Sequence, residues 1–580
     1  MSKRIRHFIV SVLSPALILG VAWFSGCENE KEIIKTVETI VRDTVTVNII
    51  SVDSIYALAD SVTEGATIKF TANTTLQAGA GALTFSWFAS GGEFHSTQGD
   101  TVEWKAPDEP GVYIVSVHAT DGTNIGIGTR QVGVAMYIPT VTPFFLGDVA
   151  CANCHSSQHN DWAETGHAHA WQTLMESGHP ASYCFPCHAV GYEPSPLTGN
   201  SGYDEAAIEK FVNVQCENCH GAASDHLANG TPDPTKVNIS FDVTTCSKCH
   251  DGTHHPFFTD WAQSGHNLDV TAHSSSSCSG CHEGVAAAYR LSEDLSAFYG
   301  SGSIASRPDT SVAPWEPINC TTCHDPHNTD NPGQLRTVAD VQLVTANGES
   351  PIITDGGVGK LCMQCHHERR GPDVHVVDGN SRFGPHHSVQ ADMMQGASAY
   401  HGIVDPSFVW ADPSHLNVEN SCKSCHLSTK EFGQGPGGAA YTGHTFEPRV
   451  DACVGCHGAI ADFDDIRALE DFDGDGSVEG IQSEVEGLLL VLQDALISTG
   501  LDTTGGVSIA SALGDTTNST FVQRGAGYNW LYVQDDGSHG IHNPDYAVQL
   551  LQQSYQYLTG SPVPNATMLI TGEQKAVAKF

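Results

Sequence analysis

The chain has 580 residues, 40% of them hydrophobic, and a formal net charge of −40. One hydrophobic core rarely organises so long a chain, so roughly two to four domains are expected. A surface this acidic is a poor match for nucleic acid or anionic lipid, and it favours basic partners or plain solvation.

The first 26 residues have the layout of a secretion signal. Lys3, Arg4 and Arg6 precede an apolar run over residues 8–24, and Ser25-Gly26-Cys27 follows. A charged start, an apolar middle and small residues at the processing point predict export. The end of the segment resembles a bacterial lipobox, which implies a mature protein that begins at a lipidated Cys27. An ordinary cleaved signal and an uncleaved anchor remain the alternatives.

Residues 27–50 are charged and β-branched, and they predict a stalk between the lipid and the first domain. Glu28 follows the cysteine where Asp would signal retention at the inner membrane. The sequence therefore favours an outer-membrane lipoprotein that faces the periplasm or the cell surface.

Residues 51–139 contain no cysteine and show apolar residues at every second position in several short segments. Strands at this spacing, separated by turn residues, predict a β-sandwich. The segment around Trp87, the turn at Trp104–Pro107 and the strand after it resemble PKD/immunoglobulin-like domains. The resemblance implies a spacer or an interaction module.

The cysteines follow one pattern. Of the 19 cysteines, Cys27 belongs to the lipobox and the other 18 form nine C-x-x-C-H motifs. The motifs are Cys151/Cys154/His155, Cys184/Cys187/His188, Cys216/Cys219/His220, Cys246/Cys249/His250, Cys278/Cys281/His282, Cys320/Cys323/His324, Cys362/Cys365/His366, Cys422/Cys425/His426 and Cys453/Cys456/His457.

This spacing is the one that covalent haem attachment requires. The two thiols add to the two vinyl groups of one haem, and the next residue, His, becomes the proximal iron ligand. Redox pairs of the thioredoxin type do not explain a repeated His, and nine motifs do not pair into zinc ribbons. A disulfide scaffold gives no reason for the His either. The sequence predicts nine covalently bound haems.

All nine motifs lie in residues 145–460, where Gly, Ser, Asn and Pro are common. We expect a mostly irregular domain of short helices that start at the motifs, with haem packed on haem. Residues 461–580 contain no cysteine, and helical patterns at residues 481–496 and 546–558 predict a small α-rich tail. The predicted fold is thus a β-sandwich, a multihaem domain and an α-rich tail.

Beyond the nine proximal ligands, 22 of the 31 histidines remain. A second His on an iron gives a six-coordinate haem suited to electron transfer, whereas a missing ligand leaves an open position for chemistry. The stretches at residues 184–192 (CFPCHAVGY) and 214–226 (VQCENCHGAASDH) resemble the family of the tetrahaem cytochrome c of ammonia oxidisers and its octahaem relatives.

The resemblance implies distal ligands. The segments DWAETGH and DWAQSGH place His167 and His266, and the spacing after a CHG motif places His226. Further candidates come from local resemblance or position: His179, His327, His387, His415, His444 and His542. The replacements considered are His159, His169, His255, His273, His386 and His401. The chain has no C-x-x-C-K motif, which is a departure from the pentahaem nitrite reductases.

An acidic loop in the tail has the spacing of an EF-hand. Asp471, Asp473, Asp475 and Glu479 offer oxygen ligands, with Gly476 at the sixth position. The twelfth position is Gln482 instead of Glu, so Glu484 or Glu486 would have to substitute. The sequence predicts a structural calcium site, and an acidic loop without metal is the alternative.

Three functions are compatible with these features. The first is an electron conduit at the cell envelope that exchanges electrons with other redox proteins or cytochromes. The second is an oxidoreductase that acts on a small nitrogen or sulfur compound at a haem with an open site. The third is a structural component of an extracellular cytochrome array, in which chains self-associate. Uniform motifs and abundant histidine favour the first, and catalytic residues are not predicted.

Overall fold

The computed structural model describes residues 50–59, 61–76, 82–108, 111–134, 142–152, 154–193, 199–204, 209–228, 232–268, 278–292 and 314–578. The predicted signal, Cys27 and almost all of the predicted stalk lie outside these ranges. Within them, no helix combines the length and the apolar character needed to cross a membrane.

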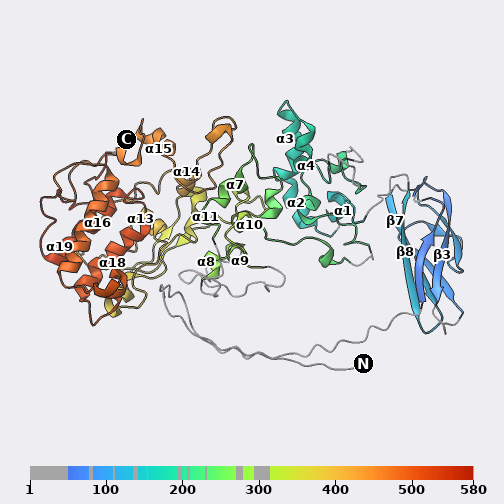
Figure 1. Cartoon of the computed structure of the whole chain (residues 1–580), viewed down its shortest axis with the longest axis horizontal. Coiled ribbons are helices and arrows are strands. Elements are labelled where there is room, and N and C mark those ends of the chain that lie inside the picture. The colour runs from blue at the N-terminus through green and yellow to red at the C-terminus, as the bar shows by residue number, and fades with distance from the viewer. Residues whose placement is uncertain are drawn as a thin grey trace, which may run out of the picture. The chain divides into compact units, whose positions relative to one another are not determined.

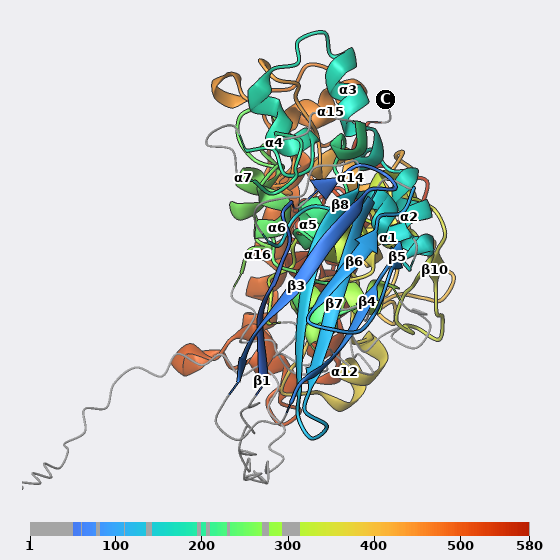
Figure 2. The ribbon, with the colours of Figure 1, turned by 90° about the vertical axis from the view of Figure 1, so that its right-hand side faces the viewer.

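The N-terminal part is built from two four-stranded sheets (Figures 1 and 2). One sheet has the order β1-β3-β6-β5 and the other β2-β8-β7-β4. The strands are β1 Ile50–Tyr56, β2 Ser61–Val62, β3 Thr67–Leu76, β4 Thr84–Ala89, β5 Glu93–Phe94, β6 Thr101–Lys105, β7 Gly111–Thr120 and β8 Ile125–Val134. The neighbours pair antiparallel except β2 and β8, which are parallel. The predicted β-sandwich is confirmed.

The alternation of side chains explains why these segments form a sandwich. On β6, Val102 and Trp104 are buried while their neighbours face outward. Trp104 packs with Phe70, and each of the two core indoles donates its N–H to a backbone carbonyl, Trp104 to Gly91 at 2.9 Å and Trp87 to Gly99 at 2.8 Å. The core therefore buries large aromatic area without leaving an indole N–H unpaired.

The region that follows consists of short helices joined by irregular chain (Figure 1). The helices are α1 Asp148–Ala152, α2 Ser156–Ala163, α3 Ala170–Glu176, α4 Phe185–His188, α5 Cys216–His220, α6 Thr244–Ser247, α7 Phe257–Ala262, α8 Ser279–His282, α9 Gly284–Ser292, α10 Cys320–Cys323, α11 Lys360–Met363, α12 Pro372–Asp378, α13 Gln390–Gln395, α14 Cys422–His426 and α15 Val450–His457. A small hairpin pairs β9 Val341–Gln342 with β10 Ile352–Ile353. The short-helix, irregular character predicted for this region is confirmed.

The C-terminal part is helical and contains the largest apolar core of the described chain. Its helices are α16 Ile481–Ser498, α17 Ile509–Gly514, α18 Phe521–Asp536 and α19 Pro544–Thr559, drawn in orange to red in Figure 1. A capping box of Thr520 and Gln523 starts α18, and Asn543 with Pro544 starts α19. The two predicted helices match α16 and α19, and α18 covers a Trp/Tyr-rich segment that the sequence pattern did not identify as a helix.

We expect Trp104→Ala to lower the free energy of unfolding of the sandwich by about 3–5 kcal/mol, because a large buried ring is lost and the Gly91 carbonyl loses its donor. Hydrogen-exchange mass spectrometry of peptides from β3, β6 and β7 in the full chain would measure the change. Phe88→Ala is the control, since Phe88 is 51% exposed. Equal protection in the two variants would contradict the assignment of Trp104 to the core.

Candidate functional site

The cysteine motifs share one local geometry. In five of them the N–H of the His donates to the carbonyl of the first Cys, four residues earlier, at 2.9–3.1 Å; examples are His155 with Cys151 and His366 with Cys362. This is one α-helical turn, and residues three and four apart lie on the same face of a helix. Both thiols and the imidazole of a motif therefore point to one side, as attachment to a single flat haem requires.

Six motif histidines face a second histidine from elsewhere in the chain. The ring centroids are 5.9–6.2 Å apart in the pairs His167/His250, His220/His327, His266/His366, His282/His386, His415/His457 and His426/His542. Two imidazoles on opposite sides of one metal ion, each with a metal–nitrogen bond of about 2 Å, have ring centres about 6 Å apart. The spacing fits one iron between the two rings of each pair.

Hydrogen bonds on the outer ring nitrogen fix the tautomer. Nδ1 of a histidine donates to a backbone carbonyl at 2.6–2.8 Å in several rings, so its Nε2 keeps the lone pair that binds metal. These rings are His188, His220, His226, His324, His415 and His426. Burial also lowers the pKa of His250 and His266 to about 4, which keeps both rings uncharged at neutral pH. The residues present therefore fit haem iron.

Two further motif histidines have a neighbour. Burial lowers the pKa of His255 and of His444, and a nearby motif ring adds to each effect, His188 to the first and His324 to the second. His155 is the remaining motif histidine. His226, predicted as a distal ligand without a named partner, is assigned to His155 by elimination and stays a prediction.

Two predicted distal ligands lie elsewhere. The structure places His386 rather than His387 opposite His282, and the 86% exposed side chain of His387 bonds to Asp535. His179 is exposed and bonds to Ser177 through Nδ1 at 3.3 Å. His386 and His387 are adjacent in sequence, so the sequence pattern does not distinguish them. They differ in the direction in which each side chain leaves the backbone.

Contacts between thiols show which motifs are neighbours. Five pairs of cysteines from different motifs interact directly: Cys151/Cys216, Cys187/Cys249, Cys246/Cys320, Cys281/Cys365 and Cys362/Cys422. Weaker interactions join Cys219 to Cys246, Cys323 to Cys362 and Cys425 to Cys453. Numbered along the chain, the motifs form the series 1-3-4-6-7-8-9, with motif 2 beside motif 4 and motif 5 beside motif 7.

Buried polar side chains hold the irregular chain in this series. The Glu217 carboxylate, inside the third motif, accepts the N–H groups of Leu146, Gly147 and Ala223 at 2.8–2.9 Å. Arg290 on α9 donates to the Gly280 carbonyl of the fifth motif and to the Gln364 carbonyl of the seventh, at 2.6 and 3.0 Å. Each brace makes several charge-assisted hydrogen bonds, which are stronger than neutral ones.

A third brace joins distant segments. The Asp260 carboxylate on α7 accepts both the N–H and the hydroxyl of Thr442, at 2.8 and 2.6 Å. Two residues later, His444 lies in edge contact with Phe257 and interacts with His324. Asp260 thereby positions His444 among the sites of motifs four and six.

A pair of buried acids lies behind the seventh motif. Glu368 and Asp392 are both fully buried, and Asp392 accepts the Glu368 N–H and the Ser398 hydroxyl, each at 2.5 Å. The Tyr528 hydroxyl of α18 donates to Glu368. Burial raises the pKa of Asp392 to about 7 and raises that of Glu368 well above its usual value. These groups tie the seventh motif to the C-terminal helices.

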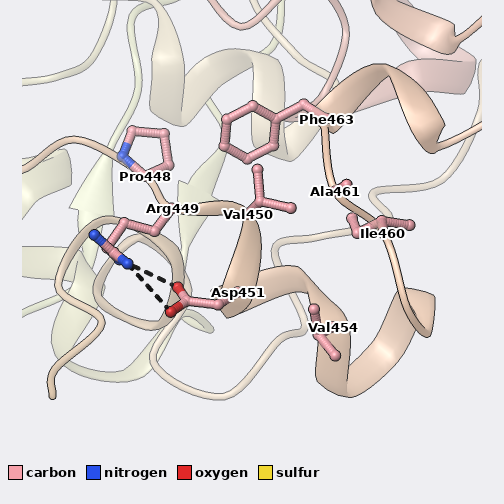
Figure 3. Close-up of a pocket in the computed structure, with 8 residues that line it drawn as sticks. All are labelled: Pro448, Arg449, Val450, Asp451, Val454, Ile460, Ala461 and Phe463. Carbon is pink, nitrogen blue, oxygen red and sulfur yellow. Dashed lines mark hydrogen bonds and ion pairs between the residues drawn. The ribbon is translucent and has the colours of Figure 1, made fainter. Parts of the chain in front are cut away.

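A hollow of about 470 Å³ lies beside the ninth motif, on α15 (Figure 3). Val450, Val454 and Phe463 give it an apolar lining, and its charged lining residues, Arg449 and Asp451, pair with each other at 3.3 Å. The hollow adds apolar surface next to the last attachment site.

The acidic loop brings some of its predicted ligands together. Oxygens of Asp471, Asp473 and Glu484 lie within 4.8 Å of one another, whereas Asp475 and Glu479 are not in this group. Glu484 accepts the backbone N–H groups of Phe472 and Glu479 at 2.8 and 3.0 Å. Burial raises the pKa of Asp473, and the neighbouring Glu484 adds to the effect.

Comparisons with known proteins agree with the motif chemistry. Residues 150–221 match the family model "Cytochrome c554 and c-prime", and residues 313–371 match the model of the doubled CXXCH motif. No curated protein sequence matches.

Two solved structures are similar to the chain. The outer cell wall cytochrome OcwA is 18% identical, with a TM-score of 0.46, and the match covers 72% of this chain and 100% of OcwA. The undecaheme cytochrome from the S-layer of Carboxydothermus ferrireducens is 19% identical, with a TM-score of 0.44, and the match covers 73% of this chain and 71% of that one.

We expect stability to depend on pH through Asp392. Its folded-state pKa is above its usual value, so its contribution is full below about pH 4 and is lost as the pH rises towards 7, by about 4 kcal/mol. Asp392→Asn removes this loss and keeps an oxygen that accepts the Glu368 N–H. Guanidinium denaturation followed by circular dichroism at pH 4 to 7 would measure the free energy of unfolding of both chains.

The control for this experiment is Asp412→Asn, at an exposed position. If the Asp392 and Asp412 variants show the same pH dependence as the unaltered chain, ionisation of Asp392 does not limit stability.

Proposed function

We propose that the chain is a multihaem c-type cytochrome that carries nine covalently bound haems and transfers electrons among them. The family models that match residues 150–221 and 313–371 support this proposal. The thiols of the nine motifs attach the haems, and the motif histidines are the proximal ligands. Bound haem supplies the one-electron iron chemistry, while the protein fixes the order, the ligands and the surroundings of the sites.

One observation carries this proposal. Six motif histidines each face a second histidine, with ring centroids 5.9–6.2 Å apart. A site with imidazole on both sides has no open position for a substrate, which suits electron transfer. For the distal ligands we propose His167, His226, His255, His266, His327, His386, His415, His444 and His542. His255 and His386 thus take the places first predicted for His179 and His387.

The series of neighbouring motifs supports a conduit. Interacting thiols connect motif 1 to motif 9 through motifs 3, 4, 6, 7 and 8. Cys154 in the first motif and Cys456 in the last are exposed, whereas the other motif cysteines are buried or partly buried. Exposed ends favour exchange of electrons with partner proteins.

We propose that the protein functions at the cell envelope. The signal layout and Cys27 support an exported lipoprotein of the outer membrane, on the periplasmic or the cell-surface side. Its partners would be other redox proteins or cytochromes, with the β-sandwich as spacer or docking module. The domain limits 1–26, 27–50, 51–139, 145–460 and 461–580 are proposed on the same sequence features.

An oxidoreductase acting on a small nitrogen or sulfur compound is the second candidate. It requires one iron without a distal ligand. The site at His155 is the candidate, because its distal ligand is assigned only by elimination. Assembly of chains into a cytochrome array is compatible with either activity.

Calcium in the tail loop is a separate proposal. The three clustered carboxylates at Asp471, Asp473 and Glu484 repel one another, and a hard divalent cation with oxygen ligands would relieve the repulsion. Glu484 would take the role that Gln482 cannot.

We expect electron paramagnetic resonance of the oxidised full-length holoprotein to show only low-spin haem. His327→Ala should convert one haem in nine to the high-spin form, because Ala offers no ligand opposite His220. The haem content is measured in parallel by the pyridine haemochrome method. A high-spin signal in the unaltered protein that shifts with nitrite or hydroxylamine would support the oxidoreductase instead.

His387→Ala is the matched control for the ligand assignment. The variant should leave all haems low-spin, since His387 faces Asp535, whereas His386→Ala should produce one high-spin haem. The reverse result would return the ligand role to His387.

We expect calcium to raise the melting temperature of the tail helices by several degrees relative to a chelator, as binding to the folded state alone stabilises it. Thermal denaturation followed by circular dichroism, with Asp471→Asn as the variant that should abolish the shift, measures this. No shift in the unaltered protein would leave the loop an acidic turn.

A further inference from the structure

We propose that Asp536 tunes the eighth haem site and makes that site more difficult to reduce. The inference rests on the proposed bis-histidine ligation, and in particular on the pair His426/His542. Asp536 acts through His542 and is therefore a positioning and tuning residue.

The contact is short and buried. Nδ1 of His542 donates to Oδ1 of Asp536 at 2.7 Å, and the Asp536 side chain is fully buried. The ring of His542 faces that of His426 with centroids 6.2 Å apart. The carboxylate thus lies on the outer nitrogen of the ring whose inner nitrogen faces the eighth site.

The local fold holds Asp536 in place. It is the last residue of α18, and Gly537 caps the helix in the left-handed conformation at φ 72°. This turn brings Ser538 back so that its N–H and hydroxyl both donate to Oδ2 of Asp536. With His542 on Oδ1, the side chain accepts from three donors and offers no proton of its own, as an ionised carboxylate does.

The other paired rings have weaker acceptors. At His415, His426 and His386 the acceptor for Nδ1 is a neutral carbonyl or hydroxyl. A second carboxylate, Asp325, lies 3.6 Å from Nδ1 of His327, beyond hydrogen-bond distance and partly exposed, and it also pairs with Arg336.

A carboxylate on Nδ1–H draws the proton away from the ring and makes the ring a more basic ligand. A more basic ligand stabilises the higher oxidation state, so the potential of the site falls. Haem bound at this site would supply one-electron chemistry between the seventh and the ninth motifs, and His542 would keep its Nδ1 proton. Since the motif series passes through the eighth site, Asp536 would change the reduction potential of one step between the seventh and the ninth motifs.

The test is a spectroscopic potentiometric titration of the full-length holoprotein. Asp536→Asn keeps an oxygen on Nδ1 but removes the charge. It should shift one of the nine reduction equilibria at least tenfold towards the reduced form, which is about 59 mV for one electron. Ser538→Ala removes a donor to the carboxylate and should shift the same centre in the opposite direction, which provides a second variant if Asp536→Asn does not accumulate.

Asp535→Asn is the matched control. It removes the same charge one residue earlier, where the carboxylate bonds to the exposed His387 instead of a paired ring. Equal titrations for the Asp535 and Asp536 variants, with nine low-spin haems in each, would overturn the tuning role alone. Missing or high-spin haem in the unaltered protein would instead overturn the proposed function.

Discussion

The placement of a second imidazole about 6 Å from six of the nine motif histidines is the constraint on which the rest of the central region depends. A motif supplies two thiols and one ring from a single helical turn, but the opposite face of the site must be filled by another part of the chain. The pairs His266/His366 and His426/His542 join segments that are far apart in sequence. Each pair is thus a tertiary contact as well as a proposed ligand set.

The central region has few long helices, so its backbone must be held in place by other interactions. Side chains that are buried and charged provide them: Glu217 gathers three backbone N–H groups, Arg290 links two motifs, and Asp260 fixes the segment that carries His444. Burying such groups is unfavourable unless their hydrogen bonds are made. Because these hydrogen bonds are directional, the three side chains specify one arrangement of the loops. Apolar side chains at the same positions would permit several arrangements.

The C-terminal helices contribute more than bulk to the last three sites. Tyr528 of α18 bonds to Glu368 behind the seventh motif, and Asp536 at the end of the same helix bonds to His542. The Ile541 carbonyl accepts from His415, which faces the ninth motif's His457. One helix and the turn after it thus reach three consecutive sites, which couples the packing of the tail to their electrostatics.

The sequence by itself determined the nine motifs proposed to attach haem, the sandwich and two of the tail helices, because each depends on residues within a few positions of one another. C-x-x-C-H fits one helical turn, and Val102 with Trp104 shows the period of a strand. Only the tertiary structure decided that His386 rather than His387 faces His282, and that Glu484 joins Asp471 and Asp473. The physical reason is that such contacts depend on the direction in which a side chain leaves a folded backbone. Neighbouring residues of the same type differ in that direction and in nothing that the sequence pattern records.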